Sequence, residues 1–197
     1  ADGRGAIEAN TSLALDALGR PHISYRLFGD LYYTYYDGAA WHPELAYTGA
    51  DVGANSLELD AAGRPHISFL DNTNLLYASY DGALWNVEVV ESAGNRGSYN
   101  SLELDAAGLP HIAYCDVNAS AVKYAHFDGT DWISETVAGD AGVQCYSSLV
   151  LDAAGRPHVG YYDAANRDLR YAWFDGFAWH TQVVDGPARV GTHGAIA

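Results

Sequence analysis

An eleven-residue pattern occurs four times in this chain and fixes what the chain can fold into. It reads LDALGRPHISY at 15–25, LDAAGRPHISF at 59–69, LDAAGLPHIAY at 104–114 and LDAAGRPHVGY at 151–161. The Ser-Leu pair before each copy recurs at intervals of 44, 45 and 47 residues, at Ser12, Ser56, Ser101 and Ser148. A period of this length indicates an array in which each repeat is one supersecondary unit.

Each repeat contains four short runs of alternating apolar and polar residues. In the last copy they cover 148–152, 158–163, 169–175 and 179–184, and they are rich in Tyr, Val and Trp. Alternation of this kind predicts β-strands. A Gly-x-Pro turn joins the first two runs and an Asp-Gly turn joins the last two, and both favour hairpins. Each repeat is therefore expected to be a four-stranded antiparallel meander.

The connection between repeats is longer than the turns within them, for example ESAGNRGSYN at 91–100. A β-propeller needs its long link at this point, because the chain returns from the outer strand of one blade to the inner strand of the next. The sequence thus predicts an all-β fold, a β-propeller of four-stranded antiparallel blades. We expect a single domain over 1–197, with four blades at about 12–48, 56–90, 101–138 and 148–185.

The number of blades in the assembled ring stays open at this stage. Residues 186–197 resemble the lead-in to a fifth repeat. The four blades therefore form either a closed four-bladed ring or half of an eight-bladed ring completed by a homodimer, unless the chain is cut from a larger parent. Closure within one chain is favoured, since open edges leave strands and apolar blade faces uncovered.

The charge balance excludes some partners. Ten Lys and Arg face 25 Asp and Glu, for a net charge of −15, so the surface should repel nucleic acid and anionic lipid. No apolar run approaches the roughly 20 residues of a membrane span. The chain starts with ADGRG and contains no Met, which is typical of a processed secreted chain or a fragment. We expect an extracellular protein.

A histidine follows the proline of every repeat. Two interpretations are open for this set. The side chain could tie its turn to the aspartate that ends the preceding run, as buried imidazoles need a partner. Alternatively, four equivalent imidazoles could converge near the ring axis and bind a divalent or transition metal ion as cofactor. The four residues are His22, His66, His111 and His158.

Tryptophan and tyrosine recur at fixed positions near the Asp-Gly turn. A structural role is the simpler interpretation, because an indole can cover the outer hairpin. Flat aromatic faces with polar edges are also what sugars stack on, so these residues are candidate ligand-binding residues between blades. They are Trp41, Trp85, Trp132 and Trp179 with Tyr33, Tyr77, Tyr124 and Tyr171.

The two cysteines and two glutamates supply further expectations. Cys115 ends the second run of the third repeat and Cys145 precedes the first run of the fourth, which places both on one face of adjacent blades. We predict a Cys115–Cys145 disulfide, in agreement with an oxidising compartment. Glu58 and Glu103 lie on the innermost strands, where they either bind a cation or sit in channel water.

The repeat, of the form SLALD…GxPHISYYD…DGxxW, resembles bacterial extracellular propeller repeats over residues 12–185. The segment PHVGYYDAANRDLRYAWFDGFAW at 157–179 is also similar to blades of fucose-binding propeller lectins. Those lectins place a glutamate after the hydrophobic-Arg pair of the third strand, and use it with an arginine to hold fucose. The matching residue here is Tyr171, after Leu169-Arg170.

The favoured function is a secreted, lectin-like module that binds a glycan or another small molecule between its blades. One alternative is a metal-binding protein or metal-dependent enzyme that uses the histidines, and another is a scaffold or engineered repeat protein. The sequence has no GxSxG, HExxH or CxxC motif, so a non-enzymatic role is favoured. The first repeat is the most divergent, with Arg26-Leu27 and a short loop at 28–31, and any asymmetric site is expected there.

Overall fold

The computed structural model describes residues 10–92, 96–139 and 146–186, and the strands in these ranges form four antiparallel sheets of four strands each. Blade 1 contains β1 (Thr11–Leu15), β2 (Pro21–Leu27), β3 (Asp30–Tyr36) and β4 (Trp41–Tyr47). Blade 2 contains β5 (Val52–Leu59), β6 (Pro65–Asp71), β7 (Asn74–Tyr80) and β8 (Trp85–Glu91). Blade 3 contains β9 (Arg96–Leu104), β10 (Pro110–Asp116), β11 (Ala121–Phe127) and β12 (Trp132–Ala138). Blade 4 contains β13 (Ser147–Leu151), β14 (Pro157–Asp163), β15 (Asp168–Phe174) and β16 (Trp179–Asp185).

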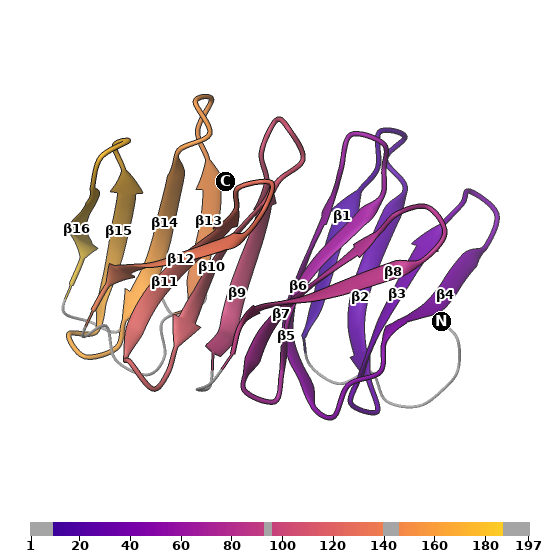
Figure 1. Ribbon diagram of the computed structural model, residues 1–197, viewed down its shortest axis with the longest axis horizontal. Coiled ribbons are helices and arrows are strands. Elements are labelled where there is room, and N and C mark those ends of the chain that lie inside the picture. The colour runs from indigo at the N-terminus through magenta and orange to yellow at the C-terminus, as the bar shows by residue number, and fades with distance from the viewer. Residues whose placement is uncertain (1–9, 93–95, 140–145, 187–197) are drawn as a thin grey trace.

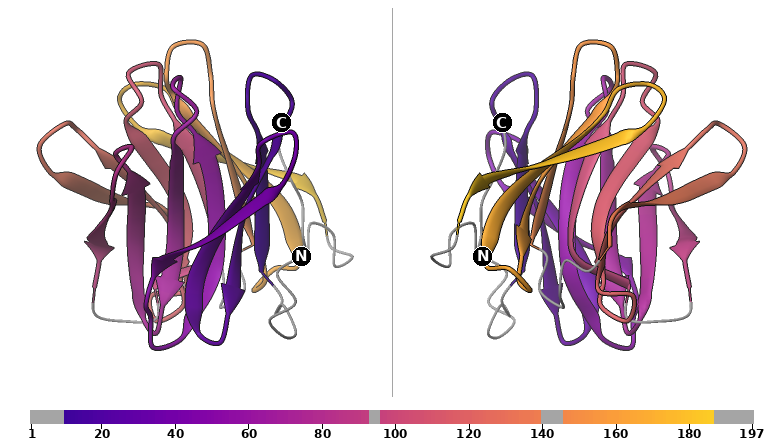
Figure 2. Two further views of the ribbon diagram at one scale, coloured as in Figure 1. Left: turned by 90° about the vertical axis from the view of Figure 1, so that its right-hand side faces the viewer. Right: turned by 90° about the vertical axis from the view of Figure 1, so that its left-hand side faces the viewer.

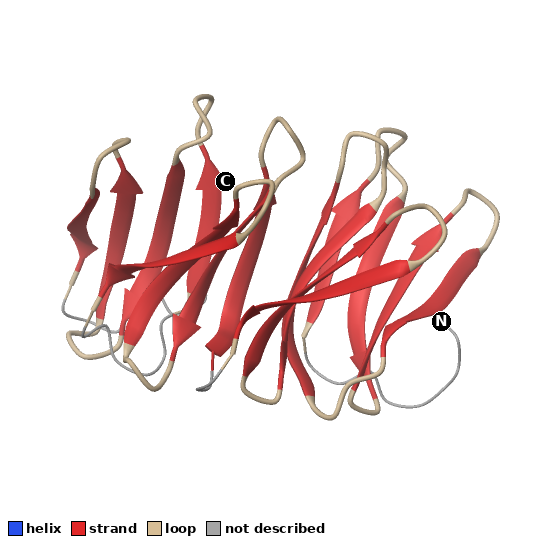
Figure 3. Cartoon of the chain, viewed as in Figure 1, coloured by secondary structure: helices blue, strands red, loops and turns tan. Residues whose placement is uncertain are grey.

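The strands of every sheet pair in chain order, so each blade is a meander. The four sheets follow one another across the molecule, from blade 1 at one end to blade 4 at the other (Figure 1). Their first strands make the contacts between neighbouring blades: β1 lies against β5, β5 against β9, and β9 against β13. Figure 2 shows the sheets fanning outward from this inner row to their fourth strands. The predicted all-β, four-bladed propeller arrangement is confirmed, and Figure 3 shows only strands and loops in the described ranges.

Two inner strands begin earlier than the repeat pattern predicts. The expected starts were Ser56 and Ser101, whereas β5 begins at Val52 and β9 at Arg96. In both strands the register with the next strand shifts within this extension, between Val52 and Asn55 in β5. A bulge of this kind hides the strand from a period-2 pattern, because it breaks the alternation of the side chains.

Both repeated turns are built around an aspartate. In the first turn of blade 2, the Asp60 carboxylate accepts hydrogen bonds from the backbone N–H groups of Ala62 and Arg64. Gly63 follows with a φ of 77°, a conformation that costs a residue with a Cβ more than glycine. In the second turn, Asp81 accepts from the N–H groups of Ala83 and Leu84. The same bonds recur in the other blades, which explains why these turns are repeated so closely.

Apolar cores fill the space between successive sheets. The second residue of each Ser-Leu pair lies in them: Leu57, Leu102 and Leu149 are 2%, 1% and 1% exposed. A serine of the preceding blade anchors each of these leucines, since the Leu57 N–H donates to Ser12 Oγ at 3.0 Å and the two later pairs repeat this bond at 3.1 Å. The three contacts between neighbouring blades therefore share one design. We call these contacts junctions 1–2, 2–3 and 3–4.

The two faces that take part in no such junction are more open. Each blade has a rear face, toward the preceding blade, and a forward face, toward the following one. On the rear face of blade 1, Leu13 and Leu15 are 61% and 60% exposed, although Leu13 matches the buried Leu57. The apolar residues that would close a ring at this end are thus in contact with solvent.

A search of the described ranges found no helix with the length and hydrophobicity needed to cross a membrane.

Candidate functional site

The repeated histidines bond within their own blades. In each blade the histidine Nδ1 forms a hydrogen bond with the hydroxyl of a tyrosine on the third strand, and the pairs are His22–Tyr33, His66–Tyr77, His111–Tyr124 and His158–Tyr171. The Nε2 atom lies 3.6–3.8 Å from the aspartate of the preceding turn, which is Asp16 for His22. Each histidine is thus tied to a tyrosine of its own blade, and at 3.6–3.8 Å the expected hydrogen bond to the turn aspartate is not formed. Within the ranges that the structure describes, no three His, Cys, Asp or Glu side chains are grouped to hold a metal ion.

Burial favours the uncharged form of three of these histidines. It lowers the pKa of His22, His66 and His111, and the charge of the nearby aspartate offsets this only in part. The partner tyrosines respond in the opposite sense, since burial raises the pKa of Tyr33, Tyr77 and Tyr124. A neutral His–Tyr pair costs little to bury when both groups are hydrogen-bonded.

The tryptophans of the Asp-Gly turns link one blade to the next. Each indole meets the repeated tyrosine of the preceding blade edge-on, with ring centroids 5.5 Å apart for Tyr33–Trp85, 5.3 Å for Tyr77–Trp132 and 5.4 Å for Tyr124–Trp179. The Trp132 indole N–H also donates to the Glu88 carboxylate at 3.0 Å. Trp41 and Tyr171 have no counterpart of this kind in the described chain, because they lie on the two outer faces. Of the eight aromatic residues singled out from the sequence, Tyr33 alone lines the pocket described next.

Cys115 is fully buried near the end of β10. Cys145 lies outside the described residues, so the disulfide between them stays a prediction.

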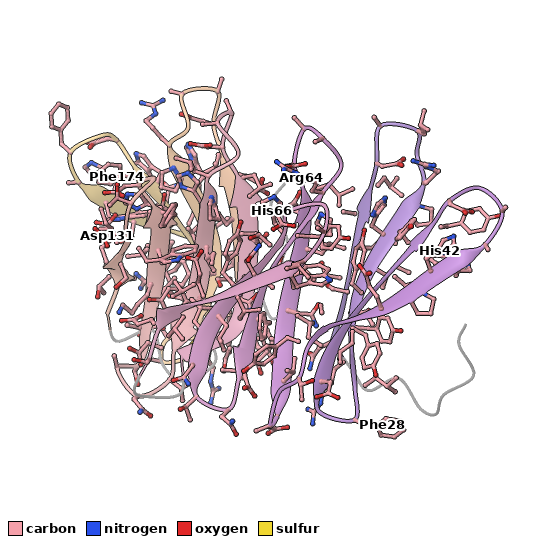
Figure 4. The ribbon with its side chains drawn as sticks, turned by 45° about the vertical axis from the view of Figure 1, so that its right-hand side comes forward. Phe28, His42, Arg64, His66, Asp131 and Phe174 are labelled. Atoms are coloured by element: carbon pink, nitrogen blue, oxygen red, sulfur yellow. The ribbon has the colours of Figure 1, made fainter. Side chains whose placement is uncertain are left out.

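A pocket of about 620 Å³ opens at junction 1–2. It lies at the end of the blades that carries the Gly-x-Pro turns. Figure 4 shows this end, with Arg64 and His66 close together, opposite the end marked by Phe28. The turns of blades 1 and 2 form its rim, and the ends of β3 and β7 supply aromatic walls. The side chains that give it its chemistry are Arg20, Tyr35, Glu44, Arg64 and Tyr80.

The two arginines are held in place by the turn aspartates. Arg20 Nε donates to Asp16 Oδ2 at 2.6 Å, and Arg64 Nε donates to Asp60 Oδ2 at 2.7 Å. Burial acts to raise the pKa of Asp16, but bonds from the backbone and side chain of Arg20 outweigh it and set that pKa at about 2. Arg20 Nη1 also donates to the backbone carbonyl of Asp37 at 3.3 Å, and Arg64 Nη2 lies 2.7 Å from Asp60 Oδ2, so both guanidinium groups are fixed where they line the pocket.

The walls combine flat rings with one carboxyl group. Tyr35 stacks between the rings of His22 and His42, at centroid distances of 5.7 and 4.9 Å. Tyr80 of blade 2 packs against Trp85. Burial raises the pKa of Glu44, and the adjacent Trp85 side chain opposes this shift. The pocket thus offers rigid aromatic surface, fixed donors and one acceptor.

The other two junctions lack this set of side chains. Leu109 occupies the arginine position of blade 3, so junction 1–2 is the one junction of the described chain between two arginine-bearing turns. The Tyr35 position holds Ser79 in blade 2 and His126 in blade 3. This asymmetry involves blade 1, but not the Arg26-Leu27 pair and the loop at 28–31 on which the expectation rested, because Phe28 of that loop lies at the opposite end of the molecule (Figure 4).

The residues that distinguish the pocket were not singled out from the sequence. The sequence does contain a signal for these residues, because the residue at the Arg20 position and the residue at the Tyr35 position differ between the four repeats. The recurring positions singled out from the sequence are identical in all four repeats, and they either bond within each blade, as the histidines do, or join neighbouring blades, as the tryptophans do.

The inner-strand glutamates lie at the later junctions. Glu58 pairs across the sheet with His66, and Glu103 with His111. Burial, with a contribution from the charge of Glu103, raises the pKa of Glu58 to about 7, and burial also raises that of Glu103. Blade 1 has Ala14 at the matching position.

Several solved structures are similar to this fold. A bifunctional GH43-CE protein of Bacteroides eggerthii is 12% identical, with a TM-score of 0.56 over 93% of this chain and 29% of its own. An exo-β-1,3-galactanase of Clostridium thermocellum is 10% identical, with a TM-score of 0.57 over 92% and 49%. An ulvan lyase of polysaccharide lyase family PL25 is 13% identical, with a TM-score of 0.59 over 87% and 56%.

The chain thus spans between 29% and 56% of the length of these proteins. At such low identity the likeness shows the β-propeller fold alone. No protein-family model matches the chain, and no curated protein matches it.

Proposed function

We propose that this protein is a carbohydrate-binding module whose glycan site is the pocket at junction 1–2. The observation that carries the proposal is that Tyr35 of blade 1 and Tyr80 of blade 2 line one pocket together with the clamped side chains of Arg20 and Arg64. No other junction of the described chain combines these four side chains.

The chemistry of the pocket suits a saccharide. A pyranose ring presents an apolar face, which stacks on an aromatic ring, and a rim of hydroxyl groups that both donate and accept hydrogen bonds. The arginines supply donors in a fixed geometry and Glu44 supplies an acceptor. Because Asp16 and Asp60 already hold the arginines, little side-chain entropy is lost when a ligand binds.

The names of similar structures agree with this chemistry. A β-1,3-galactanase and an ulvan lyase are named for polysaccharides, and both are similar to most of this chain. We favour binding over catalysis, because two of the three carboxylates at the pocket already bond arginines, which leaves Glu44 without a second carboxyl group as an acid–base partner. Asp16 and Asp60 clamp arginines, and Glu44 lies against Trp85.

We further propose that the protein acts outside the cell, where the predicted Cys115–Cys145 disulfide would persist. Mass measurement before and after reduction and alkylation tests the disulfide, which predicts no alkylated thiol in the unreduced protein.

The proposal is tested on a polysaccharide and oligosaccharide array, followed by calorimetric titration with the best ligand. Tyr80→Ala removes one wall of the pocket and should weaken binding at least tenfold, about 1.4 kcal/mol, as expected for an aromatic anchor. Incubation with the same glycan should release no shorter products.

Phe127→Ala is the matched control. Phe127 occupies the Tyr80 position in blade 3 and packs on Trp132 as Tyr80 packs on Trp85. Its removal should leave affinity unchanged. Equal losses in the two variants, or no binding on a broad array, would contradict the assignment of the site.

A further inference from the structure

We propose that the forward face of blade 4 packs against the rear face of blade 1 in a second copy of the chain. Two such contacts close a ring of eight blades. Each contact also completes a second pocket of the kind described above, and this last point rests on the proposed function.

The first support is that each half of a junction has a fixed set of parts. The forward half contributes a tyrosine from the third strand and an acidic residue from the fourth, as Tyr77 and Glu88 do in blade 2. The rear half contributes a leucine from the first strand and a tryptophan, as Leu102 and Trp132 do in blade 3. The parts recur at three successive junctions in one chain.

The second support is that one rear half, on blade 1, and one forward half, on blade 4, take part in no junction within the described chain. Blade 1 presents Leu13 and Trp41, which are 61% and 39% exposed, while the three leucines that match Leu13 are at most 2% exposed. Blade 4 presents Tyr171, Gln182 and Val184. Val184 is 54% exposed, whereas the matching Ala46 and Val137 are 7% and 6% exposed. The unused halves carry the same kinds of side chain as the halves that meet inside the chain.

The third support is the polar pair. Trp132 donates its indole N–H to Glu88 at junction 2–3. At the corresponding place blade 4 has Gln182, whose side-chain carbonyl can accept the indole N–H of Trp41 from the second copy. The neutral amide makes this bond without placing a further carboxylate in an interface of a strongly acidic protein.

A second copy fits these halves better than other occupants do. Propellers have four to eight blades, so two copies of four blades make a ring within the known range, whereas three copies would exceed it. The contact is head-to-tail, and with two copies it closes instead of growing into a filament.

The new junction would also bring two arginine-bearing turns together, as junction 1–2 does. Arg156 is clamped by Asp152 in the way that Arg64 is clamped by Asp60. The second copy contributes its own Arg20 and its own Tyr36, which occupies in blade 1 the position that Tyr80 has in blade 2. On blade 4, Trp173 stands at the Tyr35 position and stacks on His180 at 5.2 Å. Neither copy holds this pocket alone.

Light scattering coupled to size exclusion tests the proposal on the 197-residue protein. The expected result is a mass of twice 21.1 kDa at micromolar concentration. A mass of 21.1 kDa at all concentrations would overturn the proposal, and so would a polymer of more than two copies. The readout needs no ligand, so the ring can fail while glycan binding at junction 1–2 stands.

Leu13→Glu and Val184→Glu place a charge on each unused half. Either variant should weaken self-association at least tenfold without lowering the melting temperature of the monomer, because both side chains are exposed in it. A mixture of the two should form heterodimers, since one of the two junctions then has both native halves. Leu84→Glu is the matched control, because Leu84 is 68% exposed in a turn of blade 2, and it should stay dimeric. An unchanged mass in Leu13→Glu and Val184→Glu would refute the interface.

Discussion

Junctions 1–2 and 2–3 are built alike and lined differently. Both have a buried leucine bonded to a serine of the preceding blade, and both have a tyrosine that meets a tryptophan edge-on. They differ at the end that carries the Gly-x-Pro turns. The earlier blade contributes Arg20 and Tyr35 to junction 1–2, but Arg64 and Ser79 to junction 2–3. The later blade contributes Arg64 and Tyr80 to junction 1–2, but Leu109 and Phe127 to junction 2–3.

The difference separates two roles of a repeat. The identical positions bond within each blade, as the histidines do, or hold neighbouring blades together, as the leucines and tryptophans do, so they must be the same in each repeat. The positions that vary are free of this duty, and they can turn one junction into a binding site.

Truncating the shared leucine should have the largest effect, and it should be equal at both junctions. Leu57→Ala and Leu102→Ala each remove a side chain that is at most 2% exposed. Each should lower the free energy of unfolding by about 2–5 kcal/mol through lost burial and a cavity. Leu84→Ala, at an exposed turn, should change it by less than about 0.5 kcal/mol. Denaturant titration measures all three, and a loss at only one junction would contradict a common design.

Introducing pocket residues of junction 1–2 into junction 2–3 should remove the difference in glycan binding between the two junctions. The Leu109 N–H already donates to Asp105 at 2.8 Å, as the Arg64 N–H does to Asp60, so the turn is ready for an arginine. The double variant Ser79→Tyr/Leu109→Arg should raise the glycan affinity of junction 2–3 at least tenfold, about 1.4 kcal/mol. Calorimetry should then detect one more binding site per chain. An unchanged stoichiometry would show that these positions do not define the site.

Glu58, on the inner strand of blade 2, should make the free energy of unfolding depend on pH, with a smaller effect than the substitutions above. Glu58 has a pKa of about 7 in the fold against an ordinary value of 4.5, mainly through burial. The folded protein therefore holds a proton that the unfolded chain releases, and its stability falls as the pH rises from about 4.5 through 7. Glu58→Gln should raise the free energy of unfolding at pH 8 by about 1 kcal/mol, after allowance for partial solvent exposure.

The same substitution should have no effect at pH 4, where both states carry the protonated group. Thermal melts at the two pH values check this. A gain of equal size at both values would mean that the effect comes from packing and not from the charge.

Much of the fold could be predicted from the sequence. The 44- to 47-residue spacing, the turns and the long links gave four blades with the inner strand first in each. The starts of β5 and β9 could not be predicted, because the alternation is interrupted by a bulge in each. Closure of blade 4 on blade 1 within one chain was the favoured expectation, whereas Leu13 and Trp41 of blade 1 are exposed; the repeats could not decide this, since identical repeats fit rings of several sizes.

The candidate site was less accessible to sequence reasoning. Repetition drew attention to the histidines and tyrosines, which pair with each other inside each blade, as His66 and Tyr77 do. The pocket depends on which side chains of two different blades face each other across a junction. That information lies in the packing of sheets, and it became visible only when Tyr35 and Tyr80 were seen to line one pocket.

A crystal structure of the protein with its best array ligand tests the central claim most directly. The account predicts a sugar ring against Tyr35 or Tyr80, with hydroxyl groups within hydrogen-bonding distance of Arg20, Arg64 or Glu44. A sugar bound at junctions 2–3 and 3–4 as well, or on a surface away from the Gly-x-Pro turns, would contradict it.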